Sequence, residues 1–315
     1  MASEKSISSD SMCVDGSVSH GSERASSEQA RSVPEPVRKL RDKLKEKYLR
    51  ACVDLVGGQN TTEVSVEDVH VNLIIVSRPE LREEFEKSSS SSSQGTWRVD
   101  HVLAASLDHI SLESIFDMDG QSVSNGGRTY RILVAAAAGC GKTFIFTRVA
   151  PLKWAKAEMW NKFALVLTRK LYLKEVRRAA NVCDLFGVGE LGEFTGEERQ
   201  AIDDFVREQP HRVCVVLDGL DEASDRKRSG FVSDIIRGEI LRGIRLLVTS
   251  RPCQEMLSLG SKKEFDASVE LVGFRQEDVE HFIKKVMKEP EEASALVSEV
   301  QNDPYLFSMM ATPFL

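Results

Sequence analysis

The 315-residue sequence predicts an α/β fold built around a doubly wound parallel sheet. The first observation is that short, unbroken apolar runs alternate with amphipathic segments, which is typical of parallel strands covered on both faces by helices. The second is that several of these runs end directly in glycine-rich, acidic or hydroxyl-bearing segments. Because the carboxyl ends of parallel strands meet at one edge of a sheet, we expect a ligand site at that edge.

Five apolar runs account for the predicted strands. They cover 132–135, 163–168, 213–217, 244–249 and 269–272. The predicted helices cover 143–160, 171–180, 197–208, 231–241 and 276–288. Pro151 interrupts the first of these helices, and we expect a kink there because proline has no backbone donor.

Composition indicates a protein of the reducing cytosol. The net charge of −7 does not favour nucleic acid as a partner. The 6 cysteines are scattered without a C-x-x-C pair, which argues against a zinc site or a disulfide framework. Neither a signal peptide nor an apolar run of membrane-spanning length is visible, so we expect a soluble, cytoplasmic protein with no membrane span.

The strand at 132–135 runs into a segment close to the phosphate-binding pattern G-x-x-x-x-G-K-[ST]. Small residues let backbone N–H groups approach a polyphosphate, and a helix N-terminus adds a partial positive charge. Lys142 would reach the β- and γ-phosphates, and the Thr143 hydroxyl would hold Mg²⁺. The candidate nucleotide-binding residues are Ala136, Ala137, Ala138, Gly139, Cys140, Gly141, Lys142 and Thr143.

We make a specific prediction for each of two positions in this loop. Ala136 stands where the pattern has glycine; it is tolerated if its backbone is extended, and it costs about 1 kcal/mol if a positive φ is needed. Cys140 at a helix N-terminus could have a lowered pKa, but we expect a small filler rather than a reactive thiol.

Charged residues follow two further predicted strands. Asp218 comes directly after an apolar run, as a magnesium-side carboxylate would, and Asp221 and Glu222 could polarise an attacking water. Arg251 ends the run at 244–249 and could contact the γ-phosphate. The alternatives are an acidic turn and a surface arginine.

The order of these segments resembles the NACHT family of signal-transduction NTPases, the nucleotide-binding core of NOD-like receptors. The similar segments are the loop at 136–143, Trp154-Ala-Lys156, the run Val-Cys-Val-Val-Leu-Asp-Gly-Leu-Asp-Glu at 213–222, Leu-Leu-Val-Thr-Ser-Arg-Pro at 246–252, Glu-Leu-Val-Gly-Phe at 270–274, and 302–315. The resemblance implies an ADP-bound resting state that ATP exchange opens, self-association through the nucleotide-binding domain, and slow hydrolysis that resets the switch. It also implies an effector of unknown identity and, at Pro313, a residue near adenine.

The resemblance also organises the chain. We expect a disordered serine-rich tail at 1–33, a helical or mixed region at 34–127 with a serine-rich loop at 88–94, a nucleotide-binding domain at 128–274, and the incomplete start of a small helical domain at 275–315.

We also make predictions for two segments that precede the phosphate-binding loop. The segment 37–56 predicts a helix that packs by its apolar face and leaves basic residues in solvent, rather than one on a membrane. Residues 66–76 predict a strand or a buried extended segment. The tripeptide Ser77-Arg78-Pro79 that follows repeats the tripeptide at 250–252; because it precedes the phosphate loop, we expect it outside the sheet order and regard the repeat as coincidence.

The sequence leaves three functions open. The first is an ATP- and Mg²⁺-dependent switch in innate-immune-like signalling, at most a slow ATPase. The second is a P-loop ATPase with rapid turnover that does mechanical or assembly work, and Arg251 argues against it because many such enzymes have a polar Asn or Thr there. The third is a nucleotide-free scaffold with a degraded loop.

Overall fold

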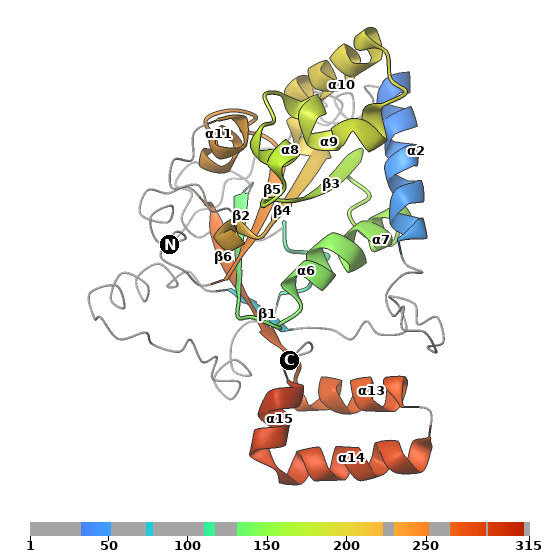
Figure 1. The fold of residues 1–315 in the computed structure, drawn as a ribbon, viewed down its shortest axis with the longest axis vertical. Helices are drawn as coiled ribbons and strands as arrows, with labels where there is room; N and C mark the ends of the chain where they lie inside the picture. Colours follow the sequence, from blue (N-terminus) through green and yellow to red (C-terminus); the bar gives the residue numbers. More distant parts are fainter. Residues whose placement is uncertain are drawn as a thin grey trace, which may run out of the picture. The chain divides into compact units, whose positions relative to one another are not determined.

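A computed structural model describes residues 33–51, 74–77, 110–116, 131–222, 230–251, 265–287 and 289–311 (Figure 1). The predictions for 1–32, 52–56, 88–94 and Pro313 lie outside these residues. Within the described residues, no helix combines the length and the apolar character that crossing a bilayer requires.

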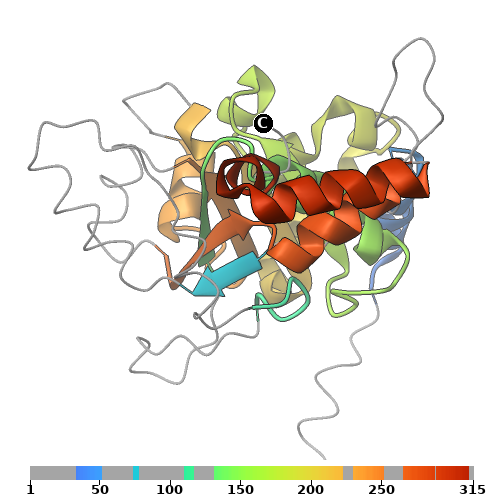
Figure 2. The same cartoon turned by 90° about the horizontal axis from the view of Figure 1, so that it is seen from below.

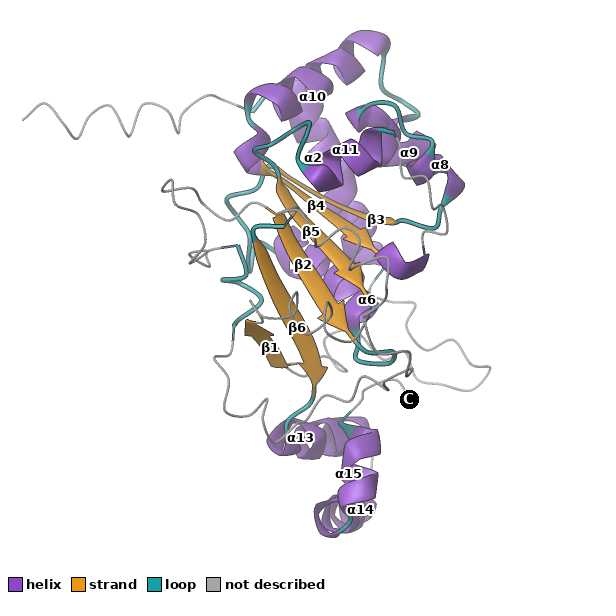
Figure 3. Cartoon of the chain, turned by 90° about the vertical axis from the view of Figure 1, so that its left-hand side faces the viewer, coloured by secondary structure: helices purple, strands orange, loops and turns teal. Residues whose placement is uncertain are grey.

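The core is a six-stranded sheet in the order β1-β6-β2-β5-β4-β3 (Figure 3). The strands are β1 (Ile74–Ser77), β2 (Arg131–Ala136), β3 (Leu165–Lys170), β4 (Val213–Asp218), β5 (Arg245–Ser250) and β6 (Ala267–Gly273). Strands β2 to β6 are mutually parallel, and β1 pairs antiparallel with β6 at the edge. The parallel sheet is confirmed, and each of its five predicted strands begins and ends within two residues of its expected limits.

The connections wind the sheet in two directions. From β2 the chain crosses to β3 at the far edge, and it then returns through β4 and β5 to β6. Because parallel crossovers are right-handed, the helices after β2 cover one face and those between β3 and β5 cover the other. The first group is α6 (Lys142–Phe144), η1 (Ile145–Val149) and α7 (Ala150–Ala155); the second is α8 (Lys174–Arg177), α9 (Val182–Leu191), α10 (Gly196–Glu208) and α11 (Phe231–Arg237).

Two details of the sheet differ from the expectations. Ser77 belongs to β1, so the tripeptide that begins there is not wholly outside the sheet. Strand β3 also continues through Arg169 and Lys170, beyond the predicted end, because backbone pairing with β4 extends to the Lys170–Asp218 pair. The apolar pattern stops earlier since these last residues leave the core.

The helix before the sheet, α2 (Glu35–Arg50), packs as predicted and covers the outer edge of β3. Val37, Leu40, Leu44 and Tyr48 are buried. Strand β3 has a free edge, and the Tyr48 hydroxyl satisfies it by donating to the Val166 carbonyl at 3.1 Å and accepting from the Thr168 N–H at 3.3 Å.

The basic face of α2 is not simply solvated. Lys39 pairs with Glu198 at 3.2 Å, Lys43 with Glu193 at 2.5 Å, and Lys47 with Glu190. Lysines spaced by four residues lie on one side of a helix, so these ion pairs join α2 to α9 and α10 along its length.

In place of a simple kink at Pro151, the helix contains a π-helical turn just before the proline. Residues 145–149 form η1 between α6 and α7, and the Ala150 N–H donates to the Ile145 carbonyl five residues earlier. A wide turn before a proline accommodates the missing donor and the bulk of the ring. The first turn after the loop remains α-helical.

Three helices follow the sheet: α13 (Gln276–Val286), α14 (Pro290–Asn302) and α15 (Pro304–Met310). They pack on one another around a separate apolar cluster that includes Phe274, Val279, Ile283 and Val297 (Figure 2). The Phe274 N–H donates to the Ala311 carbonyl at 2.9 Å, which joins the end of α15 to the residue that follows β6.

Candidate phosphate-binding site

The loop after β2 has the backbone of a phosphate cradle. Gly139 and Gly141 have φ of 81° and 82°, which only glycine adopts without strain, and Lys142 begins α6. Ala136 instead keeps the extended backbone of β2 and pairs with Leu271. A methyl group is therefore tolerated at the first position of the pattern.

Lys142 and Thr143 begin the helix at the cavity. The Lys142 residue is only 7% exposed, and within the described part of the chain no group accepts a hydrogen bond from its ammonium. The Thr143 hydroxyl donates to Asp218 Oδ2 at 3.0 Å, which links the helix to the end of β4. A buried cation without an acceptor favours an anionic ligand.

Asp218 is held from its other side by β5. The Thr249 hydroxyl donates to Asp218 Oδ1 at 2.5 Å and accepts from the Gly219 N–H at 3.1 Å. Both Asp218 and Thr249 are buried. Thr249 was not among the predicted site residues, although hydroxyl residues at the end of an apolar strand were a visible signal for it.

The other acidic residues meet Arg251. Asp221 accepts from the Arg251 N–H at 2.9 Å and pairs with the Arg251 guanidinium at 3.4 Å. Glu222 lies 3.9 Å from the same guanidinium, and the Arg251 side chain is 52% exposed. The structure therefore brings all three predicted residues together, at the end of β5 and in the 3₁₀ turn η3 (Leu220–Glu222).

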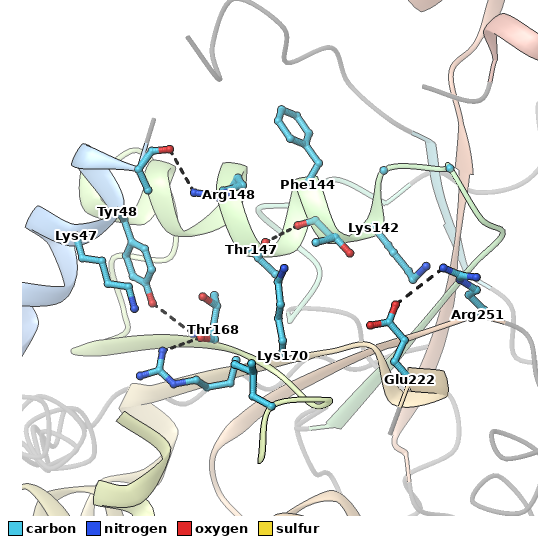
Figure 4. A pocket seen from close by; sticks show the side chains of 16 residues that line it. Lys47, Tyr48, Lys142, Phe144, Thr147, Arg148, Thr168, Lys170, Glu222 and Arg251 are labelled. Atoms are coloured by element: carbon cyan, nitrogen blue, oxygen red, sulfur yellow. Dashed lines mark hydrogen bonds and ion pairs between the residues drawn. The ribbon is translucent and has the colours of Figure 1, made fainter. Parts of the chain in front are cut away.

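These groups adjoin a cavity of about 640 Å³ (Figure 4). Of the predicted residues, Gly139, Gly141, Lys142, Thr143, Glu222 and Arg251 line it. The other predicted residues do not line it: Asp218, Asp221, Ala136, Ala137, Ala138 and Cys140. Six cationic side chains and one acidic side chain face the cavity: Lys47, Lys142, Arg148, Arg169, Lys170, Arg251 and Glu222. Such a lining attracts a polyanion.

Part of the wall comes from elements that were not predicted to belong to the site. Lys47, Tyr48 and Ala51 belong to α2 and its C-cap, and Arg169 and Lys170 end β3. Glu190 joins these elements by pairing with Lys47 and, at 2.9 Å, with Arg169. Burial opposes its charge, but Arg169 and Lys47 hold the pKa of Glu190 below its usual value.

The interpretation of Cys140 as a filler agrees with its surroundings. Its Sγ donates weakly to the Val272 carbonyl at 3.8 Å, which directs it towards β6 rather than the cavity. Burial raises the pKa of Cys140 to about 11, so the thiol stays protonated despite the nearby helix N-terminus.

The donor set beside the cavity suits a hard divalent cation. A hydroxyl and a carboxylate, those of Thr143 and Asp218, lie 3.0 Å apart at the end of the first turn of α6. Mg²⁺ prefers such oxygen ligands and takes one or two protein side chains together with phosphate oxygens. The residues present therefore fit magnesium.

Comparison with known proteins places this site in a family. The model of the NACHT domain matches residues 130–290. Protein NLRC5 of Ictalurus punctatus is 25% identical over 210 residues, which cover 58% of this chain and 12% of that protein. Nucleotide-binding oligomerization domain-containing protein 2 of Homo sapiens is 26% identical over 219 residues, with 65% and 20% covered. The chain thus spans at most about a fifth of the length of these relatives.

One solved structure is similar to the chain at lower sequence identity. The Thermotoga maritima RuvB Holliday junction branch migration motor has a TM-score of 0.31 and 12% identity, over 58% of this chain and 53% of that one. A score of this size carries no weight for the fold or for the activity.

Proposed function

The chain belongs to the NACHT family of nucleotide-binding NTPase signalling modules, and we propose that it is a switch that binds ADP and ATP with Mg²⁺ and hydrolyses ATP slowly. One observation carries the proposal: Thr143, Asp218 and Thr249 form a hydrogen-bonded chain beside a cavity into which a buried lysine projects. The degraded-scaffold alternative loses support because Ala136 is accommodated in β2.

Each residue of the site has a role in this proposal. The loop N–H groups and Lys142 bind the phosphates, with Gly139 and Gly141 providing the close backbone approach. Thr143 and Asp218 hold Mg²⁺, which when bound neutralises phosphate charge. Thr249 fixes the Asp218 carboxylate in one orientation.

Slow hydrolysis follows from the arrangement around Arg251. Asp221 and Glu222 are the candidates for orienting a water and accepting its proton, and both pair with this guanidinium. Arg251 must turn to a γ-phosphate before either carboxylate is released to orient water. Both carboxylates are thus engaged with Arg251 in this structure, as suits a switch more than a motor.

The wider role rests on family membership. We propose that ATP binding promotes self-association through this domain, in cytoplasmic, innate-immune-like signalling. The proposed self-association is supported by two relatives, from Homo sapiens and Pan troglodytes, whose names include nucleotide-binding oligomerization. The effector that the switch recruits is a separate question.

The test is titration of the chain with fluorescent ATP and ADP, with and without Mg²⁺, alongside single-turnover hydrolysis. We expect saturable binding, Mg²⁺ dependence, and loss of binding in Lys142→Ala but not in Lys174→Ala, which removes the same charge from an exposed site on α8. Absence of binding by the natural chain would eliminate the nucleotide function. Turnover of roughly 1 s⁻¹ or more would favour an enzyme with rapid turnover over a switch.

A further inference from the structure

We propose that Lys170 is a further phosphate-binding cation of this site, besides Lys142 and Arg251, and that it distinguishes ATP from ADP by binding the terminal phosphate. The inference rests on the proposed nucleotide function and adds a residue that the phosphate-loop pattern does not contain.

The position of Lys170 is fixed by strand pairing. It is the last residue of β3, and its Cα pairs with that of Asp218 on β4. The next residue continues the contact, since the Leu171 N–H donates to the Asp218 carbonyl at 2.8 Å. Neighbouring strands lie about 4.8 Å apart. Lys170 therefore leaves the sheet directly beside the carboxylate assigned to magnesium.

The Lys170 side chain projects into the cavity. In Figure 4 it extends from β3 towards the helix that carries Thr147, while Lys142 enters from that helix. The Lys170 ammonium lies 5.6 Å from the centre of the Tyr172 ring, a cation–π contact that limits its freedom. The two lysines thus enter one cavity from opposite walls.

The other cations of the cavity already have partners. Lys47 and Arg169 pair with Glu190, Arg148 donates to the Ala51 carbonyl at 3.3 Å, and Arg251 pairs with Asp221. By contrast, neither Lys142 nor Lys170 has a carboxylate partner among the residues that the structure describes. Two uncompensated ammonium groups in one cavity repel each other until an anion lies between them.

The phosphate chain gives the two lysines different ligands. Lys142 sits at the first turn of α6, where both ADP and ATP place phosphate oxygens. Lys170 enters from the opposite wall, beside Asp218 on β4, so it would bind a phosphate beyond those held by the loop, which a triphosphate has and a diphosphate lacks. Removing Lys170 should therefore weaken ATP more than ADP, whereas removing Lys142 should weaken both.

The experiment compares four proteins: the natural chain, Lys170→Ala, Lys170→Arg and Lys174→Ala. Dissociation constants for Mg-ATP and Mg-ADP are measured by competition with a fluorescent nucleotide at low and high salt, and thermal unfolding checks that each variant is folded. We expect Lys170→Ala to weaken ATP about 10-fold and ADP less than about 2-fold, as for loss of one charge-assisted hydrogen bond. Its ATP affinity should also depend less on salt.

The controls separate this inference from the function on which it rests. Lys170→Arg keeps the charge and should retain most of the preference for ATP, and Lys174→Ala should match the natural chain. If the natural chain binds both nucleotides but Lys170→Ala leaves the ATP/ADP ratio unchanged, Lys170 has no such role and the switch proposal stands. If the natural chain binds neither, both proposals fall.

Discussion

Tyr48→Phe tests whether α2 is a structural part of the sheet and so of the cavity wall. The change removes one oxygen and keeps the ring, which packs edge-on against Trp154 at a centroid distance of 6.2 Å. It leaves the Val166 carbonyl and the Thr168 N–H on the free edge of β3 without their shared partner. No methylene is lost, so the measured effect reports the hydroxyl.

The expected loss of stability follows from these two groups. A buried donor or acceptor left without a partner costs about 1–3 kcal/mol. Val166 is buried under α2 but Thr168 is only partly buried, so water would recover part of that cost. We expect about 2 kcal/mol in total for both groups, or roughly a 30-fold change in the folding equilibrium. The surrounding apolar contacts of α2 remain and should keep the variant folded.

The assay is urea denaturation followed by circular dichroism. The midpoint should fall with an unchanged slope, because the surface exposed on unfolding is the same. The matched control is Tyr172→Phe, whose side chain is 43% exposed and which should change stability by less than about 0.5 kcal/mol. A Tyr48→Phe effect as small as that of the control would refute the idea that the hydroxyl completes the edge of β3.

The same residue predicts a dependence on pH. Burial raises the pKa of Tyr48 above its model-compound value of 10.0. Its contribution to stability is therefore complete below pH 10 and is lost as the pH rises through the folded-state pKa. Tyr48→Phe should lack that part of the alkaline loss, measured as unfolding free energy between pH 8 and 11.

Three further predictions concern the phosphate loop and the carboxylate of Asp218. Gly141→Ala places a side chain at φ 82°, so it should lose about 1–2 kcal/mol of stability and weaken both nucleotides. Ala136→Gly should cost about 0.5–1 kcal/mol without improving nucleotide affinity, because the position is extended; a gain in affinity would contradict this. Thr249→Val removes both hydrogen bonds of the hydroxyl and leaves Asp218 and the Gly219 N–H each short of a partner. We expect single-turnover hydrolysis to slow about 10-fold and the affinity for ADP to change less. Hydrolysis at the natural rate in Thr249→Val would show that orientation of Asp218 does not limit the reaction.

The sequence predicted those parts of the fold that depend on local patterns. Unbroken apolar runs identified the parallel strands because burial on both faces leaves few positions for polar residues. The helix α9 was missed because Gly187 and Gly189 interrupt its pattern, and Gly187 has a non-helical φ of 78°. The edge strand β1 overlaps the end of the extended segment predicted at 66–76, but its pairing could not be predicted locally because its partner β6 lies nearly 200 positions later in the chain.

The candidate site likewise has one part that could be predicted from the sequence and one part that could not. The phosphate loop could be recognised because its function depends on backbone shape and on residues a few positions apart. The wall formed by α2 and β3 could not, since Lys47 and Arg169 reach the cavity through ion pairs with Glu190, far from both in sequence. Periodicity finds the apolar face of α2 but contains no information on which acids its lysines meet.

The charge of the cavity lining differs from the net charge of the chain, and the net charge therefore did not indicate the ligand. The chain as a whole carries −7, yet the cavity is lined by six cationic side chains and one acidic side chain. The acids that balance the chain lie elsewhere; Glu190, Glu193 and Glu198, for example, hold α2 in place. At an ionic strength near 0.15 M, charges beyond about 8 Å are screened, so a ligand within the cavity responds to its lining rather than to the net charge. Carboxylates thus fix the outer wall, whereas Lys142 and Lys170, which we propose bind phosphate, have no carboxylate partner among the described residues.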